Sequence, residues 1–366
     1  MRTIVISAIN IFEGGPLSIL KECLSYLNSL PTSKYSVIAY VHNSSLLSYP
    51  NIKMIELKKS RKNYLYRLYY EYFWFYFQSK KSDIYLWLSL HDITPNVKSQ
   101  IRAVYCHNPS PFYKLIFKEF VLEPHFGLFN LFYKWIYKIN LNKNNFVIVQ
   151  QEWLREKFRK ELKAEANIIV SNPNIKDTSN LKESIEENEI KRFFYPSFPR
   201  VFKNLECICE AARILKEKEL DFEIILTISG NENRYSRYLY HKYKNITEIK
   251  FIGKISRDNV FNIFSQTDTL LFPSKLETWG LPITEAKLLN KSILASDLPY
   301  ARETVGEYEK VTFFDPDSPE ELANLMESII NGNIEYDGNN KVLSQMPFAS
   351  SWEDMFMLLN DNNYGQ

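Results

Sequence analysis

The residues best suited to chemistry lie in one short segment, 272–286, which reads FPSKLETWGLPITEA. It holds two carboxylates, Glu277 and Glu285, with seven residues between them. Carboxylates form strong charge-assisted hydrogen bonds with hydroxyl groups, so one could hold a sugar and the other a ribose. On spacing alone a plainer interpretation stays open, in which Glu285 only favours the helix dipole and Glu277 is a solvated loop residue.

The elements around this pair would add a phosphate site. The apolar run Asp268–Phe272 predicts a buried strand, and Pro282 stands where a helix should begin, because its fixed φ suits the first turn. A helix start leaves backbone N–H groups that attract anions. The diphosphate of a sugar nucleotide would meet the N–H groups of Trp279, Gly280, Leu281 and Ile283.

A second loop could bring cations to the same diphosphate. Arg200 and Lys203 follow the strand-like run 192–195 and precede a helical pattern over Leu205–Lys218. Negative charge develops on a departing diphosphate, so fixed cations beside it lower the barrier most. For Arg200, a solvated position at the helix start is the alternative.

Glycines mark further loops where a backbone could approach a ligand closely. Gly14 and Gly15 follow the apolar strand 4–8 and precede the helical pattern 17–27. A lone Gly-Gly pair also fits an ordinary turn. Gly230 follows the strand-like run 222–229, where the backbone could contact a nucleotide base.

Polar residues end two further strands of the first half. His107 and Asn108 come directly after the apolar run 102–106, and His91 and Asp92 follow the run 84–88. Ligands of open α/β folds bind at the carboxyl ends of the strands. An isolated histidine is more often structural, and His91-Asp92 could be a turn instead of the border of an acceptor site.

Strand-like runs alternate with helical patterns along all 366 residues, which predicts parallel sheets covered by helices and two domains. We place the junction near residues 172–174, giving domains 1–172 and 173–349, with the polar segment 176–189 as an exposed excursion. A final helix over 350–366 has an apolar face that includes Trp352 and Phe356. It would cross back to the first domain or simply close the second.

Charge is unevenly divided along the chain. Residues 1–176 hold 24 Lys and Arg against 12 Asp and Glu, although the whole chain has a net charge of only +2. Half of the residues from 61 to 80 are aromatic, and basic residues flank them. Such a composition suits an anionic membrane surface, a protein core or single-stranded nucleic acid, and we favour the membrane over the nucleic acid.

The Glu277-x7-Glu285 motif and the following LASDLPYARETVG segment, 294–306, together resemble the donor-site signature of glycosyltransferase family 4. The resemblance implies retaining enzymes of the GT-B fold, an α/β architecture of two Rossmann-like parallel-sheet domains facing across a cleft. It implies that Glu277 contacts the donor sugar, Glu285 the ribose and the Gly280-Leu281 backbone the phosphate. Lys203 matches the family's lysine, whereas Ser197 stands where the family usually has its arginine.

By the same resemblance, His107 would bind the donor sugar or orient the acceptor, and Gly14-Gly15 would lie beside the phosphates. The implied activity is transfer from a UDP- or GDP-sugar to a hydroxyl, with no cofactor and no metal. The expected acceptor is a polyprenyl-diphosphate-linked saccharide in O-antigen, lipopolysaccharide or capsule assembly. A soluble acceptor and an inactive GT-B interaction subunit remain alternatives.

The expected location is the cytoplasm, peripheral to the inner face of the cell membrane. The N-terminus runs straight into a strand, which leaves no room for a signal peptide. The four cysteines form no disulfide framework, and Cys207 and Cys209 are poorly spaced for a shared metal on a helix. The Asp315-Pro-Asp317 segment is typical of a turn rather than of a metal site.

Overall fold

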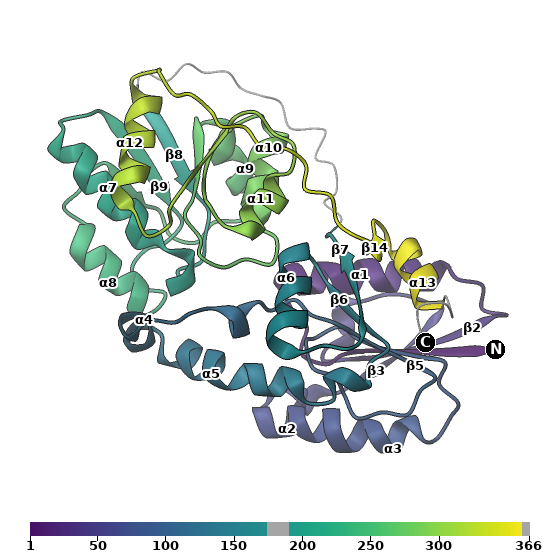
Figure 1. Ribbon diagram of the computed structural model, residues 1–366. Helices are drawn as coiled ribbons and strands as arrows, with labels where there is room; N and C mark the ends of the chain where they lie inside the picture. Colours follow the sequence, from purple (N-terminus) through teal and green to yellow (C-terminus); the bar gives the residue numbers. More distant parts are fainter. Residues whose placement is uncertain (174–189, 361–366) are drawn as a thin grey trace. The chain divides into compact units, whose positions relative to one another are not determined.

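The structure is a computed structural model that describes residues 1–173 and 190–360 (Figure 1). The polar segment 176–189, expected to be an exposed excursion, lies outside the described residues. The chain forms two compact units, each built on a parallel sheet. The expected α/β class with two parallel sheets is therefore confirmed.

The first unit contains an eight-stranded sheet of order β14-β7-β6-β5-β4-β1-β2-β3, and every pairing is parallel. The strand order reverses between β1 and β4, so the loops after these two strands meet at a switch point where α/β folds bind ligands. The strands are β1 (Arg2–Ala8), β2 (Tyr35–Val41), β3 (Ile52–Glu56), β4 (Leu86–Ser89), β5 (Ile101–Tyr105), β6 (Phe146–Val149), β7 (Asn167–Ser171) and β14 (Phe348–Ala349).

Alternate residues of β1 pack into two different cores, as the two-residue period of a strand requires. Ile4 and Ile6 face a cluster that includes α1 and α13, whereas Val5 faces a second cluster with Phe75 and Trp87. Both faces of the sheet are thus covered. The helices are α1 (Gly14–Ser29), α2 (Tyr64–Tyr69), a π-helix (Tyr70–Trp74), α3 (Phe75–Ser79), α6 (Glu152–Lys157), a second π-helix (Phe158–Leu162) and α13 (Trp352–Asn360).

The second unit contains a six-stranded parallel sheet of order β10-β9-β8-β11-β12-β13. Its order reverses between β8 and β11, which creates another switch point. The strands are β8 (Lys191–Tyr195), β9 (Phe222–Leu226), β10 (Ile249–Phe251), β11 (Thr269–Phe272), β12 (Ser292–Ser296) and β13 (Val311–Phe314). The helices are α7 (Leu205–Glu217), α8 (Arg234–Tyr243), α9 (Arg257–Ser265), α10 (Leu281–Leu288), α11 (Pro299–Val305) and α12 (Pro319–Ile330).

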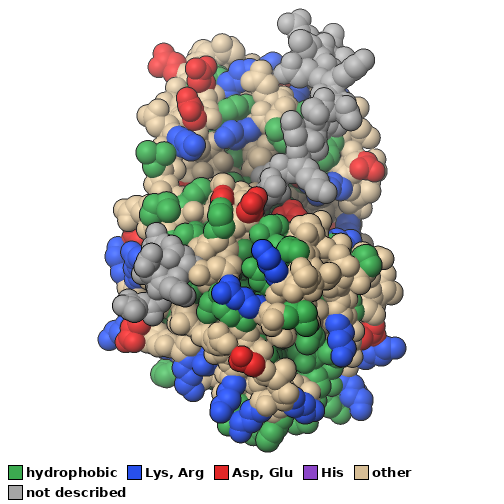
Figure 2. Space-filling view, turned by 90° about the vertical axis from the view of Figure 1, so that its right-hand side faces the viewer, with side chains coloured by type: hydrophobic (Ala, Val, Ile, Leu, Met, Phe, Trp, Pro, Cys, Tyr) green, Lys and Arg blue, Asp and Glu red, His purple; other side chains and the backbone are tan. Residues whose placement is uncertain are grey.

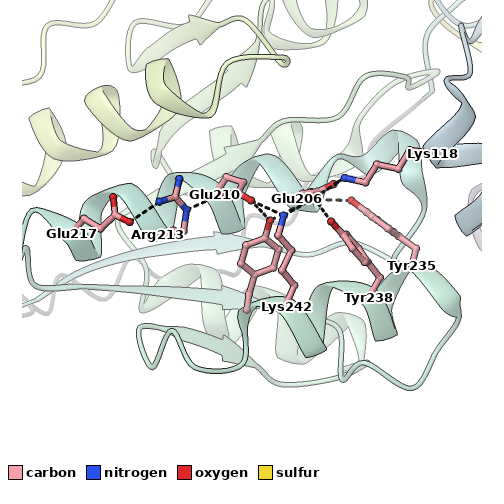
Figure 3. Close-up of polar contacts among 9 residues, drawn as sticks. Lys118, Glu206, Glu210, Arg213, Glu217, Tyr235, Tyr238 and Lys242 are labelled. Carbon is pink, nitrogen blue, oxygen red and sulfur yellow. Dashed lines mark hydrogen bonds and ion pairs between the residues drawn. The ribbon is translucent and has the colours of Figure 1, made fainter.

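The division into units differs from the expected ranges chiefly in residues 113–130, which cluster with the second unit, and also in residues 344–349, which cluster with the first. The segment 113–130 holds α4 (Phe117–Leu122) and the start of α5 (Pro124–Lys138). Lys118 of α4 forms an ion pair of 2.6 Å with Glu206, and Glu123 accepts the Val201 N–H at 2.6 Å. Figure 3 shows Lys118 at one end of a polar network that continues through Glu206 and Glu210 along α7.

The last described residues, from Ser344 onward, cluster with the first unit. Strand β14 pairs with β7, and α13 packs against α1. Met355, Phe356 and Leu359 of α13 are buried in the core on that side of the sheet. Among the described residues, no helix is long and apolar enough to cross a bilayer.

Candidate functional site

The loops after β8 and β11 carry the strongest candidates, at the switch point of the second sheet. Lys203 lies in a 3₁₀ turn after β8, and its Nζ forms a hydrogen-bonded ion pair with Oε1 of Glu277, in the loop after β11. Only about a fifth of the lysine side chain and less of the carboxylate reach solvent. The structure therefore joins the predicted phosphate cation to the predicted sugar-binding carboxylate.

Backbone contacts hold these two loops together. The Lys275 N–H donates to the Phe202 carbonyl at 2.7 Å. Asn204, with a φ of +55°, donates through Nδ2 to the carbonyls of Pro273 and Pro316, at 3.1 and 2.7 Å. Asn204 is thus a brace between loops, which fixes the lysine that precedes it.

The start of α10 is open as an anion site. Gly280 caps the helix with a φ of +89°, and no side chain caps it. Among the described residues, no hydrogen bond occupies the N–H of Gly280 or Leu281. The expected donor Ile283 is different, because its N–H already donates to the Gly280 carbonyl at 3.0 Å. Trp279 supports the loop, with its Nε1 donating to Thr284 Oγ1 at 3.2 Å.

Glu285 is a nearly buried carboxylate, 7% exposed, on the first turns of α10. Burial raises the pKa of Glu285, and the Arg257 guanidinium opposes this shift only in part. Arg257 Nη2 lies 3.7 Å from Oε1, and its own side chain is largely exposed. Such a carboxylate gains by accepting hydrogen bonds from hydroxyl groups. Sequence reasoning missed Arg257, which follows the loop after β10 without a distinguishing motif.

Arg200 has a different partner from the one expected. Its Nε lies 2.8 Å from Glu123 Oε1, and its guanidinium stacks over Phe126 and Phe202. Arg200 thus ties the segment 113–130 to the loop after β8, and its ion-pair partner is Glu123, whereas that of Lys203 is Glu277. Glu123 lies 77 positions earlier in the chain, so no local pattern could have revealed this pairing.

The packing around position 230 requires a glycine. Its φ is +88°, and a Cβ at this position would lie 2.6 Å from Cβ of Tyr240. Its N–H donates to Glu232 Oε2 at 3.1 Å, and Glu232 also accepts the Ser229 N–H at 2.6 Å. The expected base-contacting N–H is therefore occupied within the loop.

In the first unit, Gly14 and Gly15 open helix α1 directly after the loop that follows β1. Both are exposed, and Gly14 has a φ of +67°. Glu13 at the N-cap contributes no side-chain hydrogen bond, and an added Cβ on Gly15 would have nothing within 4 Å. The start of α1 is thus accessible to a ligand.

His107 is held after β5 in one tautomer. Its Nε2 lies 2.7 Å from the Leu90 carbonyl, so this nitrogen donates, and the ring stacks on Tyr105 with centroids 4.6 Å apart. Burial lowers the pKa of His107, although Asp92 opposes the shift. The ring is therefore neutral near pH 7. Nδ1 is then an acceptor, and no described residue hydrogen-bonds to it.

The three neighbouring acceptor-side candidates are engaged within the unit. Asp92, with a φ of +72°, accepts through Oδ1 from the N–H of His107 at 2.6 Å, from Asn108 N–H at 3.1 Å and from the Tyr137 hydroxyl at 3.0 Å. Asn108 Oδ1 accepts the Ser110 N–H at 3.0 Å. His91 is buried and hydrogen-bonds with Glu71. These residues brace the loop that carries His107.

No group of three or more His, Cys, Asp or Glu among the described residues is arranged to hold a metal ion. Asp315 Oδ1 accepts the Asp317 N–H at 2.9 Å, which is turn geometry, and Asp317 pairs with Lys275. Cys207 and Cys209 are buried and free.

Comparison with known proteins gives a family match over most of the second half of the chain. Residues 175–341 match the family model described as glycosyl transferases group 1. A comparison with curated proteins gives no match.

Solved structures resemble the whole chain. The sucrose-phosphate synthase of Thermosynechococcus elongatus has a TM-score of 0.62 at 16% identity, with 91% of this chain and 90% of that chain covered. The lipopolysaccharide outer core galactosyltransferase WaaB has a TM-score of 0.62 at 12% identity, with 92% of both chains covered. HepE of Anabaena, solved with UDP, has a TM-score of 0.57 at 14% identity, with 90% of both covered. The expected GT-B fold is confirmed.

Proposed function

We propose that this chain is a retaining glycosyltransferase that moves a sugar from a UDP- or GDP-sugar to an acceptor hydroxyl. The observation that carries the proposal is the grouping of the Lys203–Glu277 pair, which joins two loops, with the open start of α10 and the buried Glu285 on that helix. The group 1 match over the same unit supports it, as do the UDP complexes of HepE.

In this proposal the donor is held by three kinds of contact. The diphosphate accepts from the N–H groups of Gly280 and Leu281, where the helix dipole also favours negative charge. Lys203 turns from Glu277 toward the diphosphate, which leaves the Glu277 carboxylate for hydroxyls of the donor sugar. Glu285 accepts hydrogen bonds from the ribose hydroxyls.

Transfer would proceed on one face of the sugar. The bond from the anomeric carbon to the phosphate oxygen breaks, and the acceptor oxygen bonds to the same carbon from the same side. The acceptor proton passes to the departing phosphate oxygen, so no side chain needs to act as a nucleophile. Lys203 and the α10 N–H groups stabilise the charge that develops on the diphosphate.

His107, in the first unit, would hydrogen-bond to the donor sugar or orient the acceptor. With Nε2 donating to Leu90, its Nδ1 can accept a hydroxyl proton in a hydrogen bond. Asp92 and Asn108 would set the position of this ring rather than contact the acceptor themselves.

For the acceptor we propose a polyprenyl-diphosphate-linked saccharide of surface polysaccharide assembly, used at the cytoplasmic face of the cell membrane. The basic excess of residues 1–176 supports an anionic acceptor, and one of the similar structures is a lipopolysaccharide galactosyltransferase. A soluble acceptor is the second candidate, favoured by the likeness to sucrose-phosphate synthase. A folded protein that transfers sugar from no nucleotide sugar would favour an inactive GT-B subunit.

The donor assignment is tested by thermal shift with UDP and with GDP on the wild type, Glu285→Ala and the exposed control Glu309→Ala. A ligand that binds only the folded state raises the melting temperature. We expect one diphosphate to stabilise the wild type and the control but not Glu285→Ala. A flat response to both nucleotides would overturn the donor proposal.

The chemistry is tested by incubating the protein with the preferred donor and an acceptor, with and without EDTA. We expect the product to keep the anomeric configuration of the donor, as read by NMR coupling constants. The rate should not change with EDTA, because the cations of the site are side chains. An inverted product would overturn the retaining mechanism.

A further inference from the structure

The helix formed by α2, the π-helix and α3 packs Phe75 into the core but also buries charged side chains and exposes a row of apolar ones. Its buried positions are Arg67, Glu71, Phe75 and Ser79. Its outward positions are Leu65, Tyr69, Phe73 and Phe77, which are between 51% and 75% exposed. A helix at a protein–water surface normally shows the opposite pattern, with apolar residues inside and charges outside.

The π-helix keeps the outward residues in line. Leu65, Tyr69, Phe73 and Phe77 follow one another in steps of four, which drift around an α-helix of 3.6 residues per turn. A π turn at Tyr70–Trp74 takes an additional residue and so offsets this drift. The aromatic row therefore forms one continuous stripe.

The polar inner face fixes this orientation. Arg67 Nη2 donates to the His91 carbonyl at 2.9 Å, and Glu71 hydrogen-bonds with the His91 ring. The helix cannot rotate its aromatic row inward without pulling these charges out of their contacts. The outward aromatic stripe is thus a fixed feature of the first unit.

A second helix continues the same surface. The part of α5 in the first unit buries Tyr133 and Tyr137, but its other side exposes Leu131, Phe132 and Trp135, the last at 72%. Figure 1 shows α2 and α3 running alongside α5, and Tyr133 of α5 interacts with Arg67 of α2. The two exposed apolar rows therefore belong to one surface, which we call the α2–α5 surface.

Cations frame the α2–α5 surface almost without opposing charge. Exposed basic residues precede α2 and follow α3, namely Lys59, Arg61, Lys62, Lys80 and Lys81, and the neighbouring Lys58 is paired with Glu56 at 3.5 Å. Residues 57–82 contain only one acidic residue, the buried Glu71, and residues 124–143 contain none. On the one face of the first unit that Figure 2 shows, Lys and Arg side chains lie with hydrophobic side chains exposed between them.

We propose that the α2–α5 surface docks onto a lipid bilayer that contains anionic lipids. Outward Trp, Tyr, Phe and Leu side chains suit the boundary between headgroups and acyl chains, and the surrounding lysines suit anionic headgroups. A protein partner would need acidic residues facing every one of these cations, whereas an anionic bilayer supplies them at any orientation. This assignment rests on the first unit alone and holds for a lipid-linked or a soluble acceptor.

The test is flotation of the full-length protein with vesicles of phosphatidylcholine, with and without phosphatidylglycerol. The apolar variant is Phe73→Ser with Trp135→Ser, and its control is Leu343→Ser with Met357→Ser, two apolar residues of similar exposure outside the surface. The charge variant is Lys59→Glu with Lys62→Glu. Because all of these side chains are exposed, every variant should fold, and a melting temperature equal to that of the wild type checks this independently.

We expect binding that requires phosphatidylglycerol and persists in the control. The charge variant should bind about thirtyfold more weakly, from roughly fivefold for each lysine near an anionic surface, and the apolar variant should also bind more weakly. Equal binding of both variants and wild type, or no binding at all, would overturn the proposal. The proposal would also be overturned if the wild type sediments as a dimer and the apolar variant as a monomer, because a second copy would then occupy the surface.

Discussion

At the scale of single residues, Glu285 shows a conflict between stability and ligand binding. Its pKa is raised by burial, so its ionised form is held in an environment that favours the neutral one. A carboxylate whose pKa is raised on folding contributes stability below its unfolded pKa, and this contribution is lost as the pH rises through the folded pKa. At neutral pH the ionised Glu285 therefore destabilises the unliganded protein.

The Glu285→Gln variant should consequently melt at a higher temperature than the wild type at pH 7 in the absence of ligand. The two proteins should converge below about pH 4, under the ordinary pKa of a glutamate. The same variant should bind its nucleoside diphosphate roughly tenfold more weakly, because it loses charge-assisted hydrogen bonds. Melting curves across pH and calorimetric titration measure both effects. A lower melting temperature with unchanged affinity would show a purely structural role.

Gly280 makes a second residue-scale prediction. Its φ of +89° disfavours any side chain, and a Cβ there would lie 3.2 Å from Cζ of Phe272. Gly280→Ala should cost about 1–2 kcal/mol of stability from the left-handed backbone alone and should weaken nucleotide binding. Gly15→Ala is the matched control, because an added Cβ there meets nothing within 4 Å. Urea unfolding measures the free energy of unfolding of both variants. Equal values for the two variants would contradict the argument.

At this scale the sequence predicts residue types better than partners. The expected helix start after Gly280 is present, with Gly280 as the N-cap of α10, whereas the roles of Glu277 and Glu285 rest on the family resemblance and stay predictions. The ion pair of Lys203 with Glu277 joins residues 74 positions apart, and that of Arg200 joins it to Glu123, 77 positions earlier in the chain. Such pairs depend on tertiary packing, which one sequence does not encode in any local pattern.

At the scale of elements, most strands could be predicted because buried parallel strands read as apolar runs. Strand β6, whose four residues are all buried, is an example. Strands β3 and β14 were missed. They lie at the two edges of the first sheet, β3 mixes Lys53 and Glu56 with apolar residues, and β14 has only two residues. The exposed apolar row of α2 and α3 was also missed, because an aromatic run does not show which side faces the core.

Helix α13 makes the element-scale prediction. Phe356 is 3% exposed and stacks on Tyr26 of α1 with ring centroids 5.2 Å apart, whereas the adjacent Met357 is 58% exposed. Phe356→Ala should lower the free energy of unfolding by about 3–5 kcal/mol, the usual cost of removing a buried phenylalanine ring. Met357→Ala should change it by less than about 0.5 kcal/mol. Chemical denaturation of both measures this, and similar values would mean that α13 contributes little to the first unit.

At the scale of the whole molecule, the expected ranges and the structure agree on two sheets but differ chiefly over residues 113–130. Nothing in their composition separates them from the surrounding aromatic, basic sequence. Their place in the second unit depends on Lys118 with Glu206 and on Glu123 with Arg200. The distribution of charge can be predicted from the sequence directly, because basic and acidic residues can be counted along it.

The uneven charge predicts behaviour that the net charge conceals. A chain of net charge +2 and isoelectric point near 8.1 should pass through a cation exchanger at a pH above that point. Yet residues 1–176 carry twice as many basic as acidic residues, and fields from such a cluster act locally. We expect the protein to be retained at about pH 9 in low salt and released as salt screens the interaction.

The variant Lys59→Glu with Lys62→Glu should elute earlier than the wild type. The variant Lys244→Glu with Lys250→Glu, an equal charge change at exposed positions of the second unit, should shift elution less. Equal shifts for the two pairs would mean that the column senses only net charge, and the basic half would then lack the concentrated field that an anionic surface requires.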